Sequence, residues 1–190
     1  MRSITTDGLY ETPRATVKAT RKQDIDLDSI AESDFRIASD GTWFYHGSPI
    51  LRKSLVKLFA TILKREKDGS FWLVTPVERA KVTIDNAPFV AVAATRTGSG
   101  ENQILKFETN LGETLMAGEK HPIRVIVNPE NGQPSPYLTI SPGIEALIAR
   151  SVFYDLVEWA EEDTDLGELF IQSNRKRFSL GLLTEKDETQ

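Results

Sequence analysis

A histidine and two arginines are the side chains of this sequence best suited to binding a negatively charged group. His121 precedes a proline at the start of an apolar run, and Arg124 follows three residues later. Imidazole gains or loses a proton near neutral pH, whereas a guanidinium keeps its charge and offers two parallel N–H donors. Arg150 lies between the apolar residues Ile148 and Val152 in a helical pattern, so its charge must leave the core or find a partner. These three side chains predict contacts with an anion.

Each of these assignments has a structural alternative. His121 could instead hydrogen-bond the backbone where a strand begins, and Arg150 could pair with Asp155 or with a glutamate near the C-terminus. Tyr154 follows Arg150 by four residues, on the same side of the expected helix, and could stack or pack against a ligand. Trp43 is a second aromatic candidate for this role.

Three polar residues stand at expected turns and strand ends. Thr75 and Glu78 flank a proline-containing connection, and Asn110 follows an apolar run. A carboxylate held at such a turn can face a cleft, although Glu78 followed by Arg79 also fits a solvated sheet edge. We expect Thr75, Glu78 and Asn110 to provide polar recognition of the ligand.

No sequence pattern identifies a catalytic or metal centre. The chain has no cysteine and only two histidines, His46 and His121, which are not spaced as metal ligands on one helix. Neither a Gly-x-Ser-x-Gly pattern nor a glycine-rich nucleotide motif occurs. We therefore expect no metal, no cofactor and a binding protein rather than an enzyme. A small phosphoester hydrolase that uses His121 and Glu78 stays open as an alternative.

Short apolar runs predict strands along the chain. Residues 35–45 contain two such runs around Asp40-Gly41, a pair that tolerates positive φ, and predict a hairpin. Residues 71–74 are continuously apolar, and residues 79–84 alternate strictly. Further strands are expected within residues 103–109, 121–128, 137–140, 169–173 and 177–183.

Two helices are expected, each opened by a Ser-Pro step. Ser48 and Ser141 suit the N-cap, and the prolines that follow suit the first helical position. Apolar residues then recur with a period near 3.6 residues. Gly69 closes the first helix. The two basic residues in its first turn could help to hold an anion, but capping by Ser48 explains the same pattern.

The order of strands, helix, buried strand and exposed strand occurs twice, which indicates an internal duplication. Chance recurrence of this order is the alternative. We predict an α+β fold with two related units, each a mainly antiparallel sheet with one helix, at residues 24–96 and 97–184. Their junction is expected in the linker-like run 94–102. Residues 1–23 are predicted to form a flexible arm and residues 185–190 a disordered tail.

Composition restricts the class of protein and its partners. The 190 residues include 39% hydrophobic and 27% charged side chains, as in ordinary globular proteins. The net charge of −5 argues against nucleic-acid binding. No signal peptide and no apolar run of membrane-spanning length is present. The absence of cysteine fits a reducing cytoplasm, which is the expected location.

Several of these segments together resemble a bacterial family of domains of unknown function, family 1285. The likeness is carried by residues 41–91, by TNLGE at 109–113, by HPIRV at 121–125 and by residues 143–158, and it extends over most of residues 35–182. The resemblance implies a duplicated α+β core with a C-terminal half similar to pleckstrin-homology folds. It also implies a site for a nucleotide-like ligand between the halves, and a role in signalling. Ser141 stands where the resemblance implies an arginine, so an anion contact there is lost or moved.

We therefore expect a cytoplasmic protein that binds a small anionic, nucleotide-like molecule in the groove between its units, in a signalling or regulatory role. The alternative is a protein-interaction module without a small ligand, which would expose a strand edge or the basic turn around Arg175. A protein partner fits either hypothesis, and the oligomeric state is left open. The expected ligand contacts are His121, Arg124, Arg150, Tyr154, Thr75, Glu78, Asn110 and Trp43.

Overall fold

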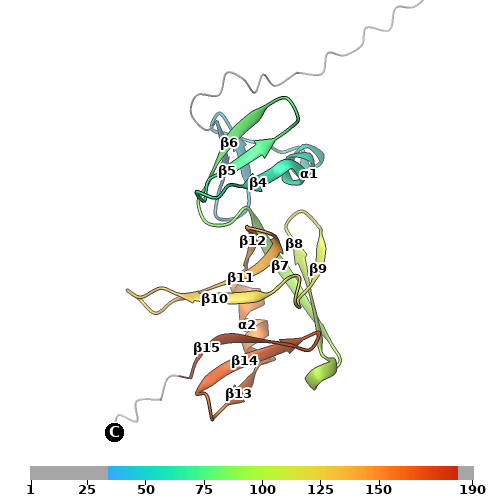
Figure 1. Cartoon of the computed structure of the whole chain (residues 1–190), viewed down its shortest axis with the longest axis vertical. Coiled ribbons are helices and arrows are strands. Elements are labelled where there is room, and N and C mark those ends of the chain that lie inside the picture. The colour runs from blue at the N-terminus through green and yellow to red at the C-terminus, as the bar shows by residue number, and fades with distance from the viewer. Residues whose placement is uncertain (1–33, 184–190) are drawn as a thin grey trace, which may run out of the picture.

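The first unit is a six-stranded sheet covered by one helix (Figure 1). The computed structural model describes residues 34–183, so the arm expected at 1–23 and the tail expected at 185–190 lie outside the described residues. Strands β1 (Phe35–Ile37), β2 (Trp43–Tyr45) and β3 (Ser48–Pro49) precede helix α1 (Lys53–Ile62), which is followed by β4 (Leu63–Arg65), β5 (Phe71–Val74) and β6 (Arg79–Ile84). The order β3-β2-β1-β6-β5-β4 places β1 beside β6 as a parallel pair.

Aromatic side chains form the core between α1 and this sheet. Residues 79–84 alternate between exposed and buried, as their sequence predicts. Phe59 of α1 packs edge-on against Phe35, with ring centroids 5.3 Å apart, and stacks on Trp43 at 6.1 Å. Because Val56 and Phe59 are the buried residues of α1, another side of the helix is left for contacts outside this core.

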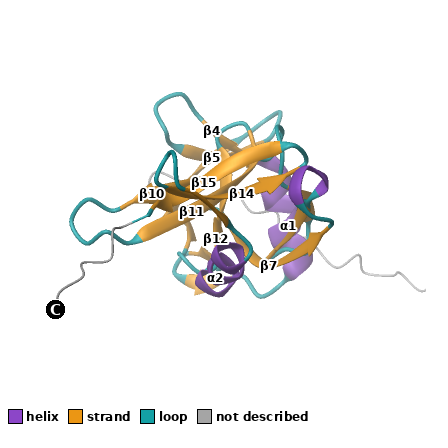
Figure 2. Cartoon of the chain, turned by 90° about the horizontal axis from the view of Figure 1, so that it is seen from below, coloured by secondary structure: helices purple, strands orange, loops and turns teal. Residues whose placement is uncertain are grey.

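The second unit contains a six-stranded sheet and a three-stranded sheet. The large sheet has the order β10-β11-β12-β7-β8-β9, and the small one β13-β14-β15. Helix α2 (Arg150–Glu158) contacts β7 and β14, and Figure 2 shows it beside β12 and β7. The strands are β7 (Phe89–Thr97), β8 (Ile104–Thr109), β9 (Thr114–Met116), β10 (Ile123–Val127), β11 (Pro134–Ser141), β12 (Ile144–Ile148), β13 (Glu161–Asp163), β14 (Glu168–Ser173) and β15 (Lys176–Leu182).

The two units differ in the number of strands and in their pairing. One antiparallel three-stranded meander precedes the helix in the first unit, whereas two precede it in the second, β7-β8-β9 and β10-β11-β12. In each unit another meander follows the helix. The meanders of the first unit join through β1 and β6 into one sheet. In the second unit β12 pairs in parallel with β7, and the later meander forms its own sheet. The expected α+β fold of two mainly antiparallel units is confirmed, whereas the duplication and the pleckstrin-homology likeness stay predictions.

The first Ser-Pro step does not cap a helix, so the expected helix start was wrong. Ser48–Pro49 is strand β3 and pairs with β2. His46 and Gly47 have φ angles of 47° and 75°, and two successive positive φ angles are typical of the tight turn in a β-hairpin. Helix α1 begins at Lys53 with no side-chain cap. Gly69, expected to close the helix, lies in the turn between β4 and β5.

The second Ser-Pro step lies in a hairpin as well. Ser141 ends β11, and a turn at Gly143, with φ of 77°, leads into β12. The side chains of β12 are buried and half-buried in alternation. In a run of only five residues, the sequence pattern of such a strand cannot be distinguished from that of a buried helix segment. Helix α2 therefore begins only at Arg150, and its N-cap Ala149 provides no side-chain hydrogen bond.

The change from one sheet to the next falls earlier than the expected boundary at 96/97. Strand β7 runs through residues 89–97 and pairs with β8 over most of its length. The linker-like run 94–102 is therefore the end of β7, its hairpin loop and a short 3-10 turn. The connection between the units lies between Ile84 and Phe89.

Candidate functional site

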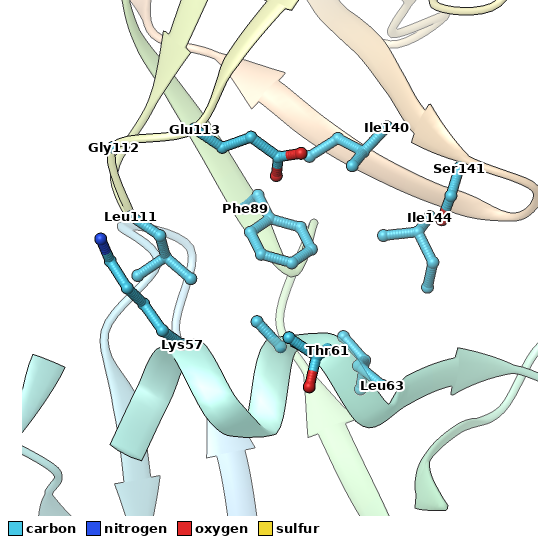
Figure 3. Close-up of a pocket in the computed structure, with 11 residues that line it drawn as sticks. Lys57, Thr61, Leu63, Phe89, Leu111, Gly112, Glu113, Ile140, Ser141 and Ile144 are labelled. Atoms are coloured by element: carbon cyan, nitrogen blue, oxygen red, sulfur yellow. The ribbon is translucent and has the colours of Figure 1, made fainter. Parts of the chain in front are cut away.

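A cavity of about 450 Å³ lies between α1 of the first unit and the large sheet of the second (Figure 3). A volume of this size is typical of small-molecule sites, which often form where two domains meet. Its apolar lining consists of Ala60, Leu63, Phe89, Leu111, Ile140 and Ile144. Its polar side chains are Lys57, Thr61, Glu113 and Ser141. We call this space the seam cavity.

Helix α1 provides one wall of the seam cavity. Lys57, Ala60 and Thr61 are spaced by three and four residues, so they lie on one side of the helix, next to the side that packs on the sheet. Figure 3 shows Lys57 extending along this wall toward Gly112. A Cβ atom at Gly112 would lie 3.9 Å from the Lys57 Nζ. Among residues 34–183, no carboxylate is within ion-pair distance of the Lys57 ammonium group.

The turn between β8 and β9 provides the opposite wall. Thr109 is 1% exposed, and its backbone N–H donates to the carbonyl oxygen of Glu113 at 2.8 Å. The Thr109 hydroxyl oxygen also accepts from the Glu113 N–H at 3.1 Å. Gly112 completes the turn with a φ of 77°. These bonds hold the backbone of Glu113, whose carboxylate points into the cavity above Phe89 (Figure 3).

Asn110 fastens this turn to the first unit. Its side-chain nitrogen donates to the carbonyl oxygen of Gly41 at 3.2 Å, and its side-chain oxygen accepts from the Val90 N–H at 3.2 Å. Its backbone N–H donates to the Val90 carbonyl oxygen at 2.8 Å. Gly41 has a φ of 81°, and a Cβ atom there would lie 2.4 Å from the Asn110 nitrogen. Asn110 therefore positions the cavity wall and does not line the cavity itself.

A smaller hollow of about 140 Å³ adjoins the connection between the units. Arg124 and Arg65 line it together with Tyr137. The Arg124 guanidinium donates two bonds of 2.6 Å to the carboxylate of Glu145, and this hydrogen bonding raises the pKa of Arg124. Arg124 also lies 4.7 Å from the Tyr137 ring centroid, and the Tyr137 hydroxyl donates to the side chain of Asn86 at 2.8 Å. Arg124 is thus already paired within the protein.

A third hollow, of about 310 Å³, lies beside the start of α2. Arg150 and Tyr154 line it together, with the Arg150 guanidinium carbon 5.9 Å from the Tyr154 ring centroid. The structure therefore brings these two predicted residues together, but at a different place from Arg124.

The remaining predicted residues lie apart from these hollows. The Nδ1 atom of His121 is 3.0 Å from the carbonyl oxygen of Thr139, which is the backbone contact considered as its alternative role. Thr75 and Glu78 bond each other across the β5–β6 turn, where the Thr75 hydroxyl oxygen accepts from the Glu78 N–H at 3.0 Å. Trp43 is 1% exposed and belongs to the core of the first unit. None of these four side chains lines the seam cavity.

Three polar residues of the seam cavity, Lys57, Thr61 and Glu113, were not among the sequence candidates. The fourth, Ser141, stands where the family resemblance implied an anion contact. In the sequence, Lys57 looks like an ordinary solvated lysine on an amphipathic helix, and Glu113 looks like an ordinary turn residue. The segment TNLGE, which carries part of the family resemblance, was the one signal that could have directed attention to Glu113.

Two further findings concern metal binding and membrane spans in the described residues 34–183. Within residues 34–183, no group of three or more histidine, aspartate and glutamate side chains is arranged to hold a metal ion. No helix in this range is both long enough and apolar enough to cross a membrane.

The fold and the seam cavity define a two-domain α+β protein with a cleft between its domains. Two family models match the chain: the domain of unknown function DUF1285, N-terminal domain, at residues 26–87, and the protein of unknown function DUF1285, C-terminal domain, at residues 88–180. The chain belongs to the DUF1285 family, as its sequence motifs indicated.

Two solved structures from this family are similar to the chain. A DUF1285 family protein from Silicibacter pomeroyi DSS-3 is 45% identical, with a TM-score of 0.74, over 80% of this chain and 81% of that one. A DUF1285 family protein from Shewanella baltica OS155 is 26% identical, with a TM-score of 0.52, over 66% of this chain and 91% of that one. Comparison with curated proteins found no match.

Proposed function

We propose that this protein binds a small anionic ligand in the seam cavity. The observation that carries the proposal is the Lys57 ammonium group, which stands at an otherwise largely apolar cavity without an ion-pair partner among residues 34–183. A ligand phosphate or carboxylate at this position would form a charge-assisted hydrogen bond. Apolar side chains, among them the largely buried ring of Phe89, would contact the body of the ligand, which fits a nucleotide-like base.

The position of the cavity supports a regulatory role for the ligand. Lys57 and Thr61 belong to the first unit, whereas Phe89 and Glu113 belong to the second. A ligand that contacts both units favours the relative placement in which both contacts form. We propose that binding signals through this placement, in the cytoplasm, the compartment that the absence of cysteine favours.

A thermal-shift panel of nucleoside monophosphates and phosphorylated metabolites tests this function. A ligand at 100 times its Kd should stabilise the protein by about 2.7 kcal/mol, which for a chain of this size raises Tm by about 5–10 °C. Lys57→Gln should weaken binding at least tenfold, since a hydrogen bond to a charged group contributes about 1.5–3 kcal/mol. Lys64→Gln is the matched control, because Lys64 is an exposed lysine that points away from Leu63 on the neighbouring strand β4.

One observation supports the alternative of a protein-interaction module. Leu51 and Leu58, before and within α1, are 86% and 57% exposed, and large exposed apolar side chains are frequent at protein interfaces. Binding of a protein partner that is lost in Leu58→Ser, together with no thermal shift by any compound of the panel, would favour this module. The hydrolase alternative has no comparable support, because neither Glu78 nor His121 lines the seam cavity.

A further inference from the structure

The seam cavity presents a negative charge as well as a positive one. Glu113 and Lys57 both line it, and neither forms an ion pair with any other residue of the described range 34–183. Figure 3 shows the two charged groups on different sides of the Phe89 ring: the Lys57 ammonium lies near Gly112, whereas the Glu113 carboxylate points toward Ile140. A ligand that fills the cavity therefore meets both groups.

The two charged groups make opposite demands on a ligand. An ionised carboxylate only accepts hydrogen bonds, and an ammonium group only donates them. A purely anionic ligand would satisfy Lys57 but would be repelled by Glu113. Both side chains are exposed to water, so a ligand that covers Glu113 without offering it a donor removes water from the carboxylate and leaves it unsatisfied, which weakens binding.

The backbone that carries Glu113 is held in place before any ligand binds. Thr109 bonds the N–H and the carbonyl group of Glu113, and Asn110 ties the same turn to Gly41 of the first unit. Lys57 stands on α1, whose position is fixed by the aromatic packing of Phe59. The backbone positions of both charged residues are therefore fixed, which limits the space that their exposed side chains can reach.

We propose that the ligand is bipolar: it carries an anionic group that meets Lys57, N–H donors that meet Glu113, and a flat or apolar part that lies against the apolar lining around Phe89. This inference rests on the proposed function and adds Glu113 as the residue that selects the ligand. Two kinds of molecule share this chemistry. One is a nucleotide whose base edge presents adjacent N–H donors, and the other is an amino acid with an apolar side chain.

Two matched pairs of probes test the inference by titration calorimetry. GMP presents two adjacent N–H donors on its base, whereas UMP presents one N–H between two carbonyl oxygens. L-phenylalanine carries an ammonium group that 3-phenylpropanoate lacks. In at least one pair, the donor-bearing member should bind the wild-type protein at least tenfold more tightly than its partner. Glu113→Gln should remove this preference, and Lys57→Gln should weaken both members of the pair.

The outcomes separate this inference from the proposed function. If a compound binds the wild-type protein but neither pair shows this preference, the bipolar ligand is ruled out while anion binding in the seam cavity stands. The same holds if the preference exists but survives in Glu113→Gln. If no probe and no compound of the phosphorylated panel binds the wild-type protein, both proposals fail together. Glu108→Gln is the control for loss of an exposed glutamate, since Glu108 does not line the cavity.

Discussion

The side-chain amide of Asn110 in the second unit donates a hydrogen bond to the carbonyl oxygen of Gly41 in the first, at a distance of 3.2 Å. This contact joins the β1–β2 turn to the turn that carries Glu113. It gives Asn110 a structural role where the sequence suggested ligand contact. The cavity wall therefore depends on a bond between the units as well as on the fold of each unit.

Replacing Asn110 should destabilise the protein. Asn110→Ala leaves the Gly41 carbonyl and the Val90 N–H without their side-chain partner, and an unsatisfied buried polar group costs about 1–3 kcal/mol. Gly41→Ala should also destabilise, because its new Cβ atom would lie 2.4 Å from the Asn110 nitrogen at a φ of 81°. Urea denaturation measures both effects. The double variant should lose less stability than the two single losses combined, since the crowding disappears with Asn110. Additive losses would show that the two side chains do not interact.

Gly143 tests the packing between the units at a second point. A Cβ atom at Gly143 would lie 3.3 Å from the Cβ and Cδ atoms of Arg65, at a φ of 77°. Gly132 has a similar φ of 68° but no atom within 4 Å of its Cβ position. Both alanine variants should lose about 1–2 kcal/mol for the left-handed backbone. Gly143→Ala should lose more, by urea denaturation, because it also displaces Arg65. Equal losses would mean that the side chain of Arg65 moves to accommodate the added methyl group at no measurable cost in stability.

Acid stability should depend on the small sheet. Bonds from the backbone N–H of Leu166 and from the Arg177 guanidinium hold the pKa of Asp163 below its ordinary value of 3.8. Bonds from Ser179 and Arg177 likewise hold the pKa of Glu168 below 4.5. Because the folded-state pKa values are lowered, both carboxylates stabilise the fold above their ordinary pKa values, and this contribution is lost as pH falls through the lowered values.

Asp163→Asn should make the acid side of the stability curve less steep. The variant should be less stable than the wild type at about pH 6, and the two curves should approach each other as pH falls below 3.8 and the wild-type carboxylate takes up its proton. Urea midpoints measured across this range provide the comparison. Parallel curves would exclude Asp163 as a contributor to the acid transition.

The observed starts of the two helices predict how substitutions at Ser48, Ser141 and Ala149 change stability. Ser48→Ala and Ser141→Ala should change stability by less than about 0.5 kcal/mol, since neither serine caps a helix. Ala149→Asp should stabilise by about 1 kcal/mol, because Ala149 is the N-cap of α2 and lacks a side-chain hydrogen bond. Thermal unfolding of the three variants measures these effects. A loss near 1 kcal/mol in Ser141→Ala would instead indicate that Ser141 caps a helix, as the sequence suggested.

Local patterns predicted the strands better than the helix starts. The alternation of residues 79–84 and the Asp40-Gly41 turn gave β6 and the β1–β2 hairpin, because a period of two and a positive φ are local properties. Ile144–Ile148 failed as a helix because its four apolar residues, interrupted by Glu145, fit either period over so short a run, and pairing with β7 and β11 decides between them. That pairing is a tertiary contact which the local pattern does not contain.

The candidate site was harder to predict for a related reason. Lys57 and Glu113 come from different units, and each has an ordinary local role, on an amphipathic helix and in a tight turn. They share a cavity because the two units pack against each other, and the bond from Asn110 to Gly41 is one of the contacts between the units. The more conspicuous candidates were already engaged elsewhere: Trp43 in the core and Arg124 with Glu145.

Filling the seam cavity tests the central claim most directly. Ala60 lines the cavity from α1, so Ala60→Phe should occupy it, whereas Thr83→Phe adds the same side chain at an exposed position of β6. With the nucleotide and metabolite panel, at least one compound should raise Tm of the wild type and of Thr83→Phe by about 5–10 °C at 100 times its Kd. The shift should vanish in Ala60→Phe. A wild type that no compound stabilises, or a shift that persists in Ala60→Phe, would contradict the account.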